Sequence, residues 1–237
     1  MEERFLRTAS IIGADGQQRL KGCHVIVFGV GGVGGYTVEA LARAGVGALT
    51  LVDSDVISVS NINRQIIATH SSVGKPKVLA FAERIKDINP DCRVTVRQEF
   101  FLPESADTYN FKDYDYIVDA IDTVSAKLAL AEIAEREGVR IISSMGAGNK
   151  LNPLAFEVAD IYKTSVCPLA RAMRTQLKKR GVKSLKVVYS KEEALPRHPS
   201  VEHLFKEGEK APGSISFVPS AVGLIIAGEV IRELASV

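Results

Sequence analysis

The chain has 237 residues, 46% of them hydrophobic and 24% charged, and its formal net charge is only +2. These values are ordinary for a globular protein, and the length suffices for one full α/β core, so we expect a single domain. No basic start is followed by an apolar core, so we expect no secretory signal peptide. The longest apolar stretch, near Ala221–Ala227, is far shorter than the roughly 20 residues of a membrane span, so we expect no membrane partner.

Three cysteines, Cys23, Cys92 and Cys167, lie far apart and form no C-x-x-C pair. This spacing argues against a disulfide framework and a structural zinc site, and it indicates a reduced, cytoplasmic compartment. Cys167 directly precedes Pro168 at a predicted helix start, where it is either a functional thiol or an ordinary small apolar residue.

The first predicted elements end in a strand–helix–strand unit. Residues 1–12 are predicted to form an arm, followed by a short helix over residues 15–21. The apolar runs His24–Phe28 and Ala48–Val52 predict strands, and Tyr36–Ala44 predicts the helix between them. A glycine-rich turn over residues 29–34 joins the first strand to the helix, and Asp53 follows the second strand, as in nucleotide-binding βαβ units.

Each part of this unit has a physical task. Gly29 permits the tight turn, Gly31 lets the backbone approach a phosphate, and Gly34 lets the helix pack on the strand. The N–H groups at the helix start favour an anion, and Asp53 can accept hydrogen bonds from ribose hydroxyls. We therefore predict nucleotide binding at Gly29, Gly31, Gly32, Gly34 and Asp53; the alternative is that the glycines serve only helix–strand packing.

Alternating strands and helices continue to residue 150. We predict strands at Val94–Val96, Tyr116–Ala120 and Val139–Ser144, and helices at Val78–Ile88 and Ser125–Glu137, the latter ended by Gly138. This order predicts a Rossmann-like, doubly wound and mainly parallel α/β sheet, with residues 1–150 as a nucleotide-binding core. Ligands in such sheets lie beyond the carboxyl ends of the strands, where Asp122 and residues 146–148 also belong.

Residues 151–237 are predicted to be a C-terminal extension of the same domain. Ala155–Asp160 and Leu185–Tyr189 are expected strands, added antiparallel to the sheet, with a basic helix Pro168–Arg180 between them. Residues 192–213 combine three prolines with charges and are interpreted as a mobile loop or lid. Ser220–Leu234 is so apolar that we expect a helix buried in the core.

A group of polar residues follows the second strand. Asn61, Arg64, Gln65 and Lys77 lie within 25 residues of Asp53, and two cations with two amides can surround a triphosphate. Arg64 and Lys77 would stabilise charge that develops on the phosphates during nucleotidyl transfer. Asp122 could hold Mg²⁺ together with the phosphates, since this ion needs only one or two carboxylates. The alternative is that the cations are solvated surface charges and Asp122 caps the helix that begins near Thr123.

The motifs together resemble a known family. Residues 29–34, Asp53, Asn61-x-x-Arg64-Gln65, Gly74-x-Pro-Lys77 and residues 120–122 look like the adenylation core of the ThiF and ubiquitin-activating-enzyme-like adenylyltransferase superfamily, over roughly residues 4–145. Further stretches resemble one subfamily, the tRNA threonylcarbamoyladenosine dehydratases. These stretches are residues 89–101, 146–148, 187–190 and 213–219.

The resemblance implies ATP and Mg²⁺ as cofactors. ATP would adenylate the threonyl carboxylate of the modified adenosine next to the anticodon, and the activated acyl group would then close a ring with loss of AMP. No enzyme nucleophile is strictly needed for this reaction. The implied site residues are Gly29, Gly31, Gly32, Gly34, Asp53, Asp55, Asn61, Arg64, Gln65, Lys77 and Asp122, with Asp122 as the metal ligand and Arg64, Lys77 and Asp122 as catalytic groups.

The resemblance also implies a homodimer in which an N-terminal arginine enters the nucleotide site of the partner. The segment Arg4-Phe5-Leu6-Arg7 resembles that region, and Arg7 is our choice for the catalytic arginine, with Arg4 close behind. A solvated terminal arginine is the alternative. Whether a sulfur-transfer or redox partner protein acts with the chain stays open.

The charge distribution favours an RNA partner. Residues 161–191 contain nine basic residues and no acidic ones, a local field that the small net charge conceals. Within the resemblance, this block has a reason: Arg171, Arg174, Lys178, Lys179 and Arg180 could bind tRNA phosphates. The ordinary alternative is a solvated helix face.

Three functions therefore remain in view. The first is the ATP-dependent tRNA dehydratase, which the missing C-x-x-C pairs and the basic block favour. The second is an adenylyltransferase that activates the C-terminus of a ubiquitin-like sulfur carrier. The third is a NAD-linked oxidoreductase or a nucleotide-sensing module without catalysis.

Overall fold

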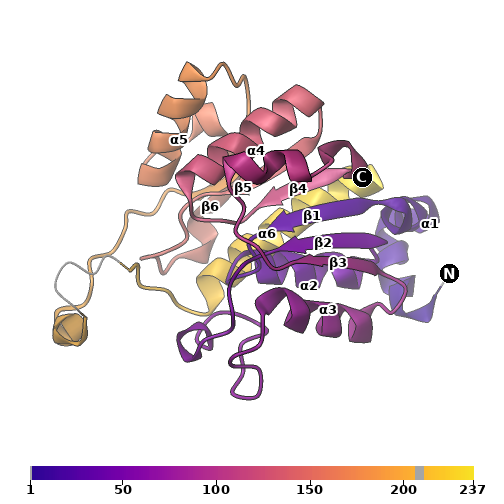
Figure 1. Ribbon diagram of the computed structural model, residues 1–237, viewed down its shortest axis with the longest axis horizontal. Helices are drawn as coiled ribbons and strands as arrows, with labels where there is room; N and C mark the ends of the chain where they lie inside the picture. The colour runs from indigo at the N-terminus through magenta and orange to yellow at the C-terminus, as the bar shows by residue number, and fades with distance from the viewer. Residues whose placement is uncertain (1, 206–210) are drawn as a thin grey trace.

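The protein is built on one seven-stranded sheet with the strand order β3-β2-β1-β4-β5-β7-β6 (Figure 1). The computed structural model describes residues 2–205 and 211–237. The strands are β1 (His24–Phe28), β2 (Ala48–Val52), β3 (Arg93–Arg97), β4 (Tyr116–Asp119), β5 (Arg140–Ser144), β6 (Phe156–Asp160) and β7 (Lys186–Ser190). The Rossmann-like α/β architecture predicted from the sequence is confirmed.

The strand directions follow from burial and connection length. β1 and β2 are apolar runs that pair in parallel through a helical crossover, as is typical of strands covered on both faces. The predicted antiparallel extension is confirmed only for β6, which pairs antiparallel with β7. The expectation for β7 itself was wrong, because β7 pairs in parallel with β5 and extends the parallel sheet by one strand.

Helices cover both faces of the sheet (Figure 1). They are α1 (Leu6–Gly22), α2 (Gly34–Ala44), α3 (Lys77–Ile88), α4 (Val124–Glu137), α5 (Pro168–Lys179) and α6 (Phe217–Ala235). α6 packs against α1 and α2, and α2 packs against α3, so these four form one layer. α4 and α5 pack together in the other layer. The apolar core lies between each layer and the buried strands.

The N-terminal arm predicted over residues 1–12 is wrong, because this segment is helical. A short 3-10 helix, Glu3–Phe5, leads directly into α1, which is kinked at Gly13. Glycine is a poor helix former, so the sequence underestimates this helix. Packing against α6 stabilises it instead: Gly16 lies against Ala235, and Arg19 Nε donates a hydrogen bond of 2.9 Å to the Ala235 carbonyl.

The apolar C-terminal helix is buried on one face only. Val222, Ile226 and Val230 are fully buried in the core. Leu224 on the other face remains 52% exposed, so the expectation of a wholly buried helix was wrong. Phe217 on the same helix and Leu154 beside it, in the 3-10 helix Pro153–Ala155, are also exposed. α6 therefore presents an apolar strip outward, which is common at interaction surfaces.

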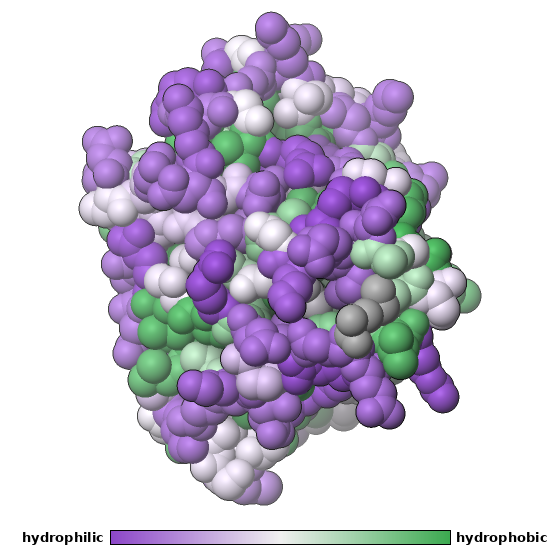
Figure 2. Space-filling model, turned by 90° about the vertical axis from the view of Figure 1, so that its right-hand side faces the viewer, coloured by the Kyte–Doolittle hydropathy of each residue, from purple (hydrophilic) through white to green (hydrophobic). Residues whose placement is uncertain are grey.

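The segment over residues 192–213 was predicted to be a lid, and part of it lies outside the described residues. Its described part includes the 3-10 helix Pro199–Leu204, which stands apart from the main body at the lower left of Figure 1. The right-hand side of the molecule in Figure 1 faces the viewer in Figure 2, where its surface is mostly hydrophilic with separate hydrophobic patches. Among the described helices, none is both long and apolar enough to cross a membrane.

A buried ionic network joins β4, α4 and β5. The Lys127 Nζ donates to Asp119 Oδ2 at 2.9 Å, and Ser143 Oγ donates to the same oxygen at 2.5 Å. All three residues are fully buried. Removal of one charge from such a pair leaves the other uncompensated in a low-dielectric interior.

We expect Lys127→Met to lower the free energy of unfolding by about 3–5 kcal/mol, because the Asp119 carboxylate loses its buried counter-ion. Urea unfolding followed by circular dichroism measures this change. Arg136→Met is the matched control, since the Arg136–Glu137 pair is exposed and should contribute less than about 1 kcal/mol. Equal effects of the two substitutions would contradict the role given to the buried pair.

Candidate active site

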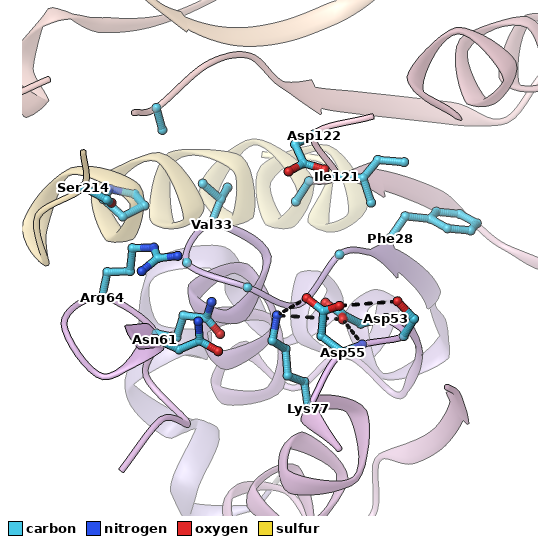
Figure 3. Close-up of a pocket in the computed structure, with 18 of the residues that line it drawn as sticks. Phe28, Val33, Asp53, Asp55, Asn61, Arg64, Lys77, Ile121, Asp122 and Ser214 are labelled. Atoms are coloured by element: carbon cyan, nitrogen blue, oxygen red, sulfur yellow. Dashed lines mark hydrogen bonds and ion pairs between the residues drawn. The ribbon is translucent and has the colours of Figure 1, made fainter. Parts of the chain in front are cut away.

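A cavity of about 460 Å³ opens at the carboxyl ends of β1, β2 and β4. This volume lies in the range of small-molecule sites. The cavity collects all the predicted nucleotide-binding residues except Gly34, and Figure 3 labels several of them. Its lining includes Gly29, Gly31, Gly32, Asp53, Asp55, Asn61, Arg64, Gln65, Lys77 and Asp122.

Two glycines shape the turn for steric reasons. Gly29 has φ of +81°, and a Cβ there would lie 2.8 Å from the Ala120 carbonyl oxygen. At Gly34 a Cβ would lie 1.8 Å from the Gly29 carbonyl oxygen, so only glycine lets α2 pack so closely. Both predicted conformational roles are confirmed. Gly31 has only the distant Gln65 amide near its Cβ position, so its backbone remains open to the cavity.

Asp53 fixes the glycine turn, a role that the sequence did not reveal. Its Oδ2 accepts a hydrogen bond of 2.8 Å from Val30 N, and its Oδ1 accepts one of 2.9 Å from Asp55 N. The carboxylate thus joins the end of β2 to the turn after β1. One acidic residue therefore positions the backbone groups that face the cavity.

Lys77 is the first residue of α3 and its side chain is buried. Its Nζ lies 2.7 Å from Asp55 Oδ2 and 3.9 Å from Asp53 Oδ1 (Figure 3). A buried ammonium group is costly unless it is paired, and these carboxylates supply the pairing. The Asp55 side chain is itself largely exposed, so an anion in the cavity can compete with it for Lys77.

The polar segment after β2 folds into short turns, and its side chains make different contacts at the cavity. Asn61 Oδ1 accepts a hydrogen bond of 3.1 Å from Ser58 N, so this oxygen stabilises the loop. Arg64 Nη1 donates to the Ser60 carbonyl and to Asn63 Oδ1, both at 2.9 Å, and its side chain lines the cavity. Gln65 is buried, and its Oε1 has no hydrogen-bond partner within the described part of the chain.

Asp122 lies across the cavity from Lys77 and Asp53 (Figure 3). It follows β4 in a turn that is held by Asp119, whose Oδ1 accepts a hydrogen bond of 3.3 Å from Ile121 N. No cluster of three or more His, Cys, Asp or Glu side chains suited to a metal occurs in residues 2–205 and 211–237. Asp122 by itself can offer one carboxylate to a cation that phosphates also hold, which is the ligand set Mg²⁺ accepts.

The described residues that line the cavity carry more acidic than basic groups. They include four carboxylates, Asp53, Asp55, Glu99 and Asp122, and two cations, Arg64 and Lys77. Glu99 was not predicted, although it follows β3 at the same sheet edge and the parallel topology could have indicated it. The difference of two negative charges means that an anionic ligand needs further positive charge to bind.

One end of the cavity is apolar and was also not predicted. Phe28, Val52, Phe101 and Ile121 line it, and the Phe28 and Phe101 rings pack at 4.7 Å between centroids. Such a surface suits a flat heterocyclic base. The opposite wall comes from residues near the start of α6, Ser214 and Pro219, which no motif in the sequence relates to the glycine turn.

Arg7 lies far from the cavity of its own chain. α1 leads into the start of β1, so it lies at the amino ends of the strands, whereas the cavity lies at their carboxyl ends (Figure 1). Arg4 Nη2 donates to Asp91 Oδ2 at 2.7 Å. The exposed Arg7 side chain has no partner among the described residues, so Arg7 is freer than Arg4 to contact another molecule.

The basic helix α5 is amphipathic, and only part of its charge is free. Arg174 Nη1 donates to the Thr164 carbonyl at 3.0 Å, and Arg180 pairs with Glu132 at 2.9 Å. Arg171, Lys178 and Lys179 are exposed and have no side-chain partner in the described structure. Arg174, which the sequence predicted as a tRNA-binding residue, is thus half-buried and its guanidinium is engaged by the loop at Thr164.

None of the cysteines is among the described residues that line the cavity. Burial raises the pKa of the Cys92 thiol to about 11, and it also raises the pKa of Cys23. Cys167 is buried in the apolar cluster beneath α5. The geometry thus favours the structural interpretation of Cys167 over the catalytic one.

The sequence and the fold both match known proteins. The ThiF family profile matches residues 3–237. The tRNA threonylcarbamoyladenosine dehydratase of Bacillus subtilis is 40% identical over 99% of this chain and 95% of its own length. The Escherichia coli protein of the same name is 43% identical over 74% of this chain and 66% of its length.

Solved structures agree with this result. A crystal structure of the E. coli tRNA N6-threonylcarbamoyladenosine dehydratase in complex with ATP superposes with a TM-score of 0.88 at 34% identity, covering 99% of this chain and 94% of that one. The complex of the same enzyme with AMP gives the same values. The structural match includes both the glycine turn and α6. Since the family profile also spans residues 3–237, the chain belongs to the ThiF family.

Proposed function

We propose that the protein is an ATP-dependent tRNA threonylcarbamoyladenosine dehydratase, which converts this nucleoside next to the anticodon into its cyclic form. The observation that carries the proposal is the end-to-end likeness to an ATP-bound dehydratase, combined with a cavity that brings Arg64, Lys77 and Asp122 around the glycine turn. A cytoplasmic location follows from the tRNA substrate.

The first step is adenylation of the substrate carboxylate. A carboxylate oxygen attacks the α-phosphorus of ATP, and pyrophosphate leaves. The adenine base fits the apolar end at Phe28 and Phe101, and the phosphates then extend toward Gly31, Arg64 and Lys77. Lys77 exchanges Asp55 for a phosphate oxygen, and both cations stabilise the charge that develops on the transferring group.

The charge of the cavity supports Mg²⁺ and a further arginine. ATP carries about four negative charges at neutral pH, and the lining has two more acidic than basic groups. Mg²⁺ bound by Asp122 and the phosphates would offset two of these charges. An arginine from a partner subunit would offset one further negative charge. Both Mg²⁺ and this arginine would therefore reduce the repulsion between ATP and the acidic groups of the site.

The second step closes a ring without an enzyme nucleophile. An atom of the same threonylcarbamoyl side chain attacks the activated acyl carbon, AMP leaves, and the attacking atom loses its proton. The nucleoside has then lost one water, and ATP has become AMP and pyrophosphate. Attack within one side chain benefits from a high effective molarity. This scheme agrees with a cavity that no described cysteine lines.

The packing of α1 and α6 supports a homodimer with Arg7 acting in the partner subunit. The start of α6 adjoins the cavity, whereas its end packs against α1. If the exposed apolar strips at Leu224 pair across a two-fold axis perpendicular to α6, the two α6 helices run antiparallel. Each cavity then lies near the partner's α1, where Arg7 is exposed. A sulfur-transfer or redox partner protein stays a prediction from the family resemblance alone.

The free cations of α5 support tRNA binding. Arg171, Lys178 and Lys179 extend into solvent, while Arg174 and Arg180 hold α5 in place through Thr164 and Glu132. Phosphate contacts of this kind release counter-ions and make binding depend strongly on salt.

The reaction is tested by mass spectrometry of nucleosides from modified tRNA after incubation with the protein, ATP and Mg²⁺. We expect a product lighter by one water. Lys77→Met should reduce its rate by about 10²-fold or more, since one electrostatic donor contributes on that scale. Asp122→Asn should raise the Mg²⁺ concentration needed for half-maximal rate. An unchanged nucleoside mass with the wild-type protein would refute the proposal.

The role of Arg7 is tested by mixing inactive subunits. Arg7→Ala should reduce turnover by about 10³-fold or more if it acts as an arginine finger. Mixing this variant with Lys77→Met should restore about a quarter of the activity, because half the dimers are mixed and each has one complete site. Arg4→Ala, whose guanidinium pairs with Asp91, is the control. Failure of the mixture to recover activity would exclude action between subunits.

Binding of labelled modified tRNA between 50 and 200 mM salt tests α5. The double variant Lys178→Ala, Lys179→Ala should weaken binding and reduce the slope of log K against log salt concentration by roughly one to two. Lys86→Ala, an exposed lysine of α3 in the opposite helical layer, should leave the slope unchanged. A slope equal to that of the wild type would remove α5 from the RNA interface.

A further inference from the structure

We propose that a second cavity, at the root of the segment over residues 192–215, binds the base of the nucleoside that undergoes the reaction. This inference rests on the proposed function and adds to it the location of the substrate. The second cavity has a volume of about 300 Å³. It shares Ala211, Pro212 and Ser214 with the lining of the nucleotide cavity, so a molecule bound across this wall can reach both.

The second cavity is fixed to the nucleotide site by Asn149, which follows the glycine stretch after β5. Asn149 N donates to the Gly213 carbonyl at 2.8 Å, and its Oδ1 accepts from Gly213 N at 2.6 Å. Its own carbonyl accepts from Leu195 N at 2.8 Å. Asn149 therefore holds the segment near both of its ends, at Leu195 and at Gly213. Gly148 allows this approach, since a Cβ there would lie 2.6 Å from Pro212 Cβ.

The lining of the second cavity suits a flat base. The Arg197 guanidinium carbon lies 3.8 Å from the centroid of the Phe205 ring, and Val201 and Ile215 provide apolar walls. Arg197 also donates a hydrogen bond to the Ala211 carbonyl, so it connects the earlier part of the segment to its later part. Proteins bind unstacked RNA bases on aromatic rings and guanidinium planes of this kind.

The basic groups of the second cavity are already engaged within the protein. Its described lining contains Lys150 and Arg197 and no acidic side chain, but Lys150 Nζ donates to the Glu192 carbonyl at 2.6 Å and Arg197 lies against Phe205 and pairs with Glu202. We therefore assign the base to the second cavity and leave the phosphate backbone to the free cations of α5. The threonylcarbamoyl arm of a nucleoside bound in the second cavity would extend past Ser214, which lines both cavities. The Ser214 carbonyl accepts a hydrogen bond from Asn63, which in turn accepts one from Arg64. This path leads to the predicted phosphate end of the nucleotide cavity.

The test is a thermodynamic cycle between Phe205 and the base. Two labelled anticodon stem-loops that both lack the threonylcarbamoyl arm are compared by fluorescence anisotropy, one with unmodified adenosine at the reactive position and one abasic there, both with Mg²⁺ and α,β-methylene ATP. Loss of the base should weaken wild-type binding about tenfold. In Phe205→Leu, which keeps apolar volume but removes the ring, loss of the base should cost about twofold or less. Phe205→Tyr should restore the wild-type difference.

Leu204→Ala is the matched control, since Leu204 is exposed beside Phe205 but does not line the second cavity. An equal cost of base removal in the wild type and in Phe205→Leu would overturn the inference. If the wild type nevertheless dehydrates a stem-loop that carries the modified nucleoside, only the assignment of the second cavity fails. If the wild type forms no dehydrated product, the proposed function fails with it.

Discussion

The cavity depends on the carboxylate of Asp53. This one group holds Val30 in the turn after β1, holds Asp55 in the loop after β2, and lies 3.9 Å from the ammonium of Lys77 at the start of α3. Three segments that are separate in the sequence thus share one anchor. The steric fit of Gly34 against Gly29 adds a second constraint, because only glycine at residue 34 lets α2 pack so close to the end of β1.

Electrostatics explains why a site for a polyanion contains so many acids. Asp53 and Asp55 pair with the buried Lys77 and hold its side chain in position before any nucleotide arrives. Asp122 is placed where it can bind a cation rather than the nucleotide itself. In the proposed mechanism, such a site attracts phosphate only weakly until Mg²⁺ and the partner arginine are also present. Weak binding of ATP in the absence of the other components suits an enzyme that consumes ATP only together with its RNA substrate.

The sequence predicted the parts of the protein that local patterns determine. The strand limits of β1 and β2 were correct because they are short apolar runs between turn residues, and the cavity residues up to Asp122 were correct because parallel strands end at one sheet edge. The first half of α1 was missed because tertiary packing, such as that of Ile12 against the core, stabilises it, whereas its second half was predicted as a helix over residues 15–21. Ser214 and Pro219 were missed for the same reason, and the contact of Arg174 with Thr164 is a tertiary detail that charge counting cannot reveal.

The position of α6 has a consequence for how the protein matures. α6 follows every other element in the chain, yet it covers the sheet, receives α1 and closes one wall of the cavity. During synthesis the glycine turn, Asp53 and Lys77 emerge long before this wall exists. A nascent or shortened polypeptide therefore has the phosphate-binding turn without an enclosed chamber, and competence for chemistry arrives only with the final helix. The wall that Pro219 contributes is thus formed only after α6 has been synthesised.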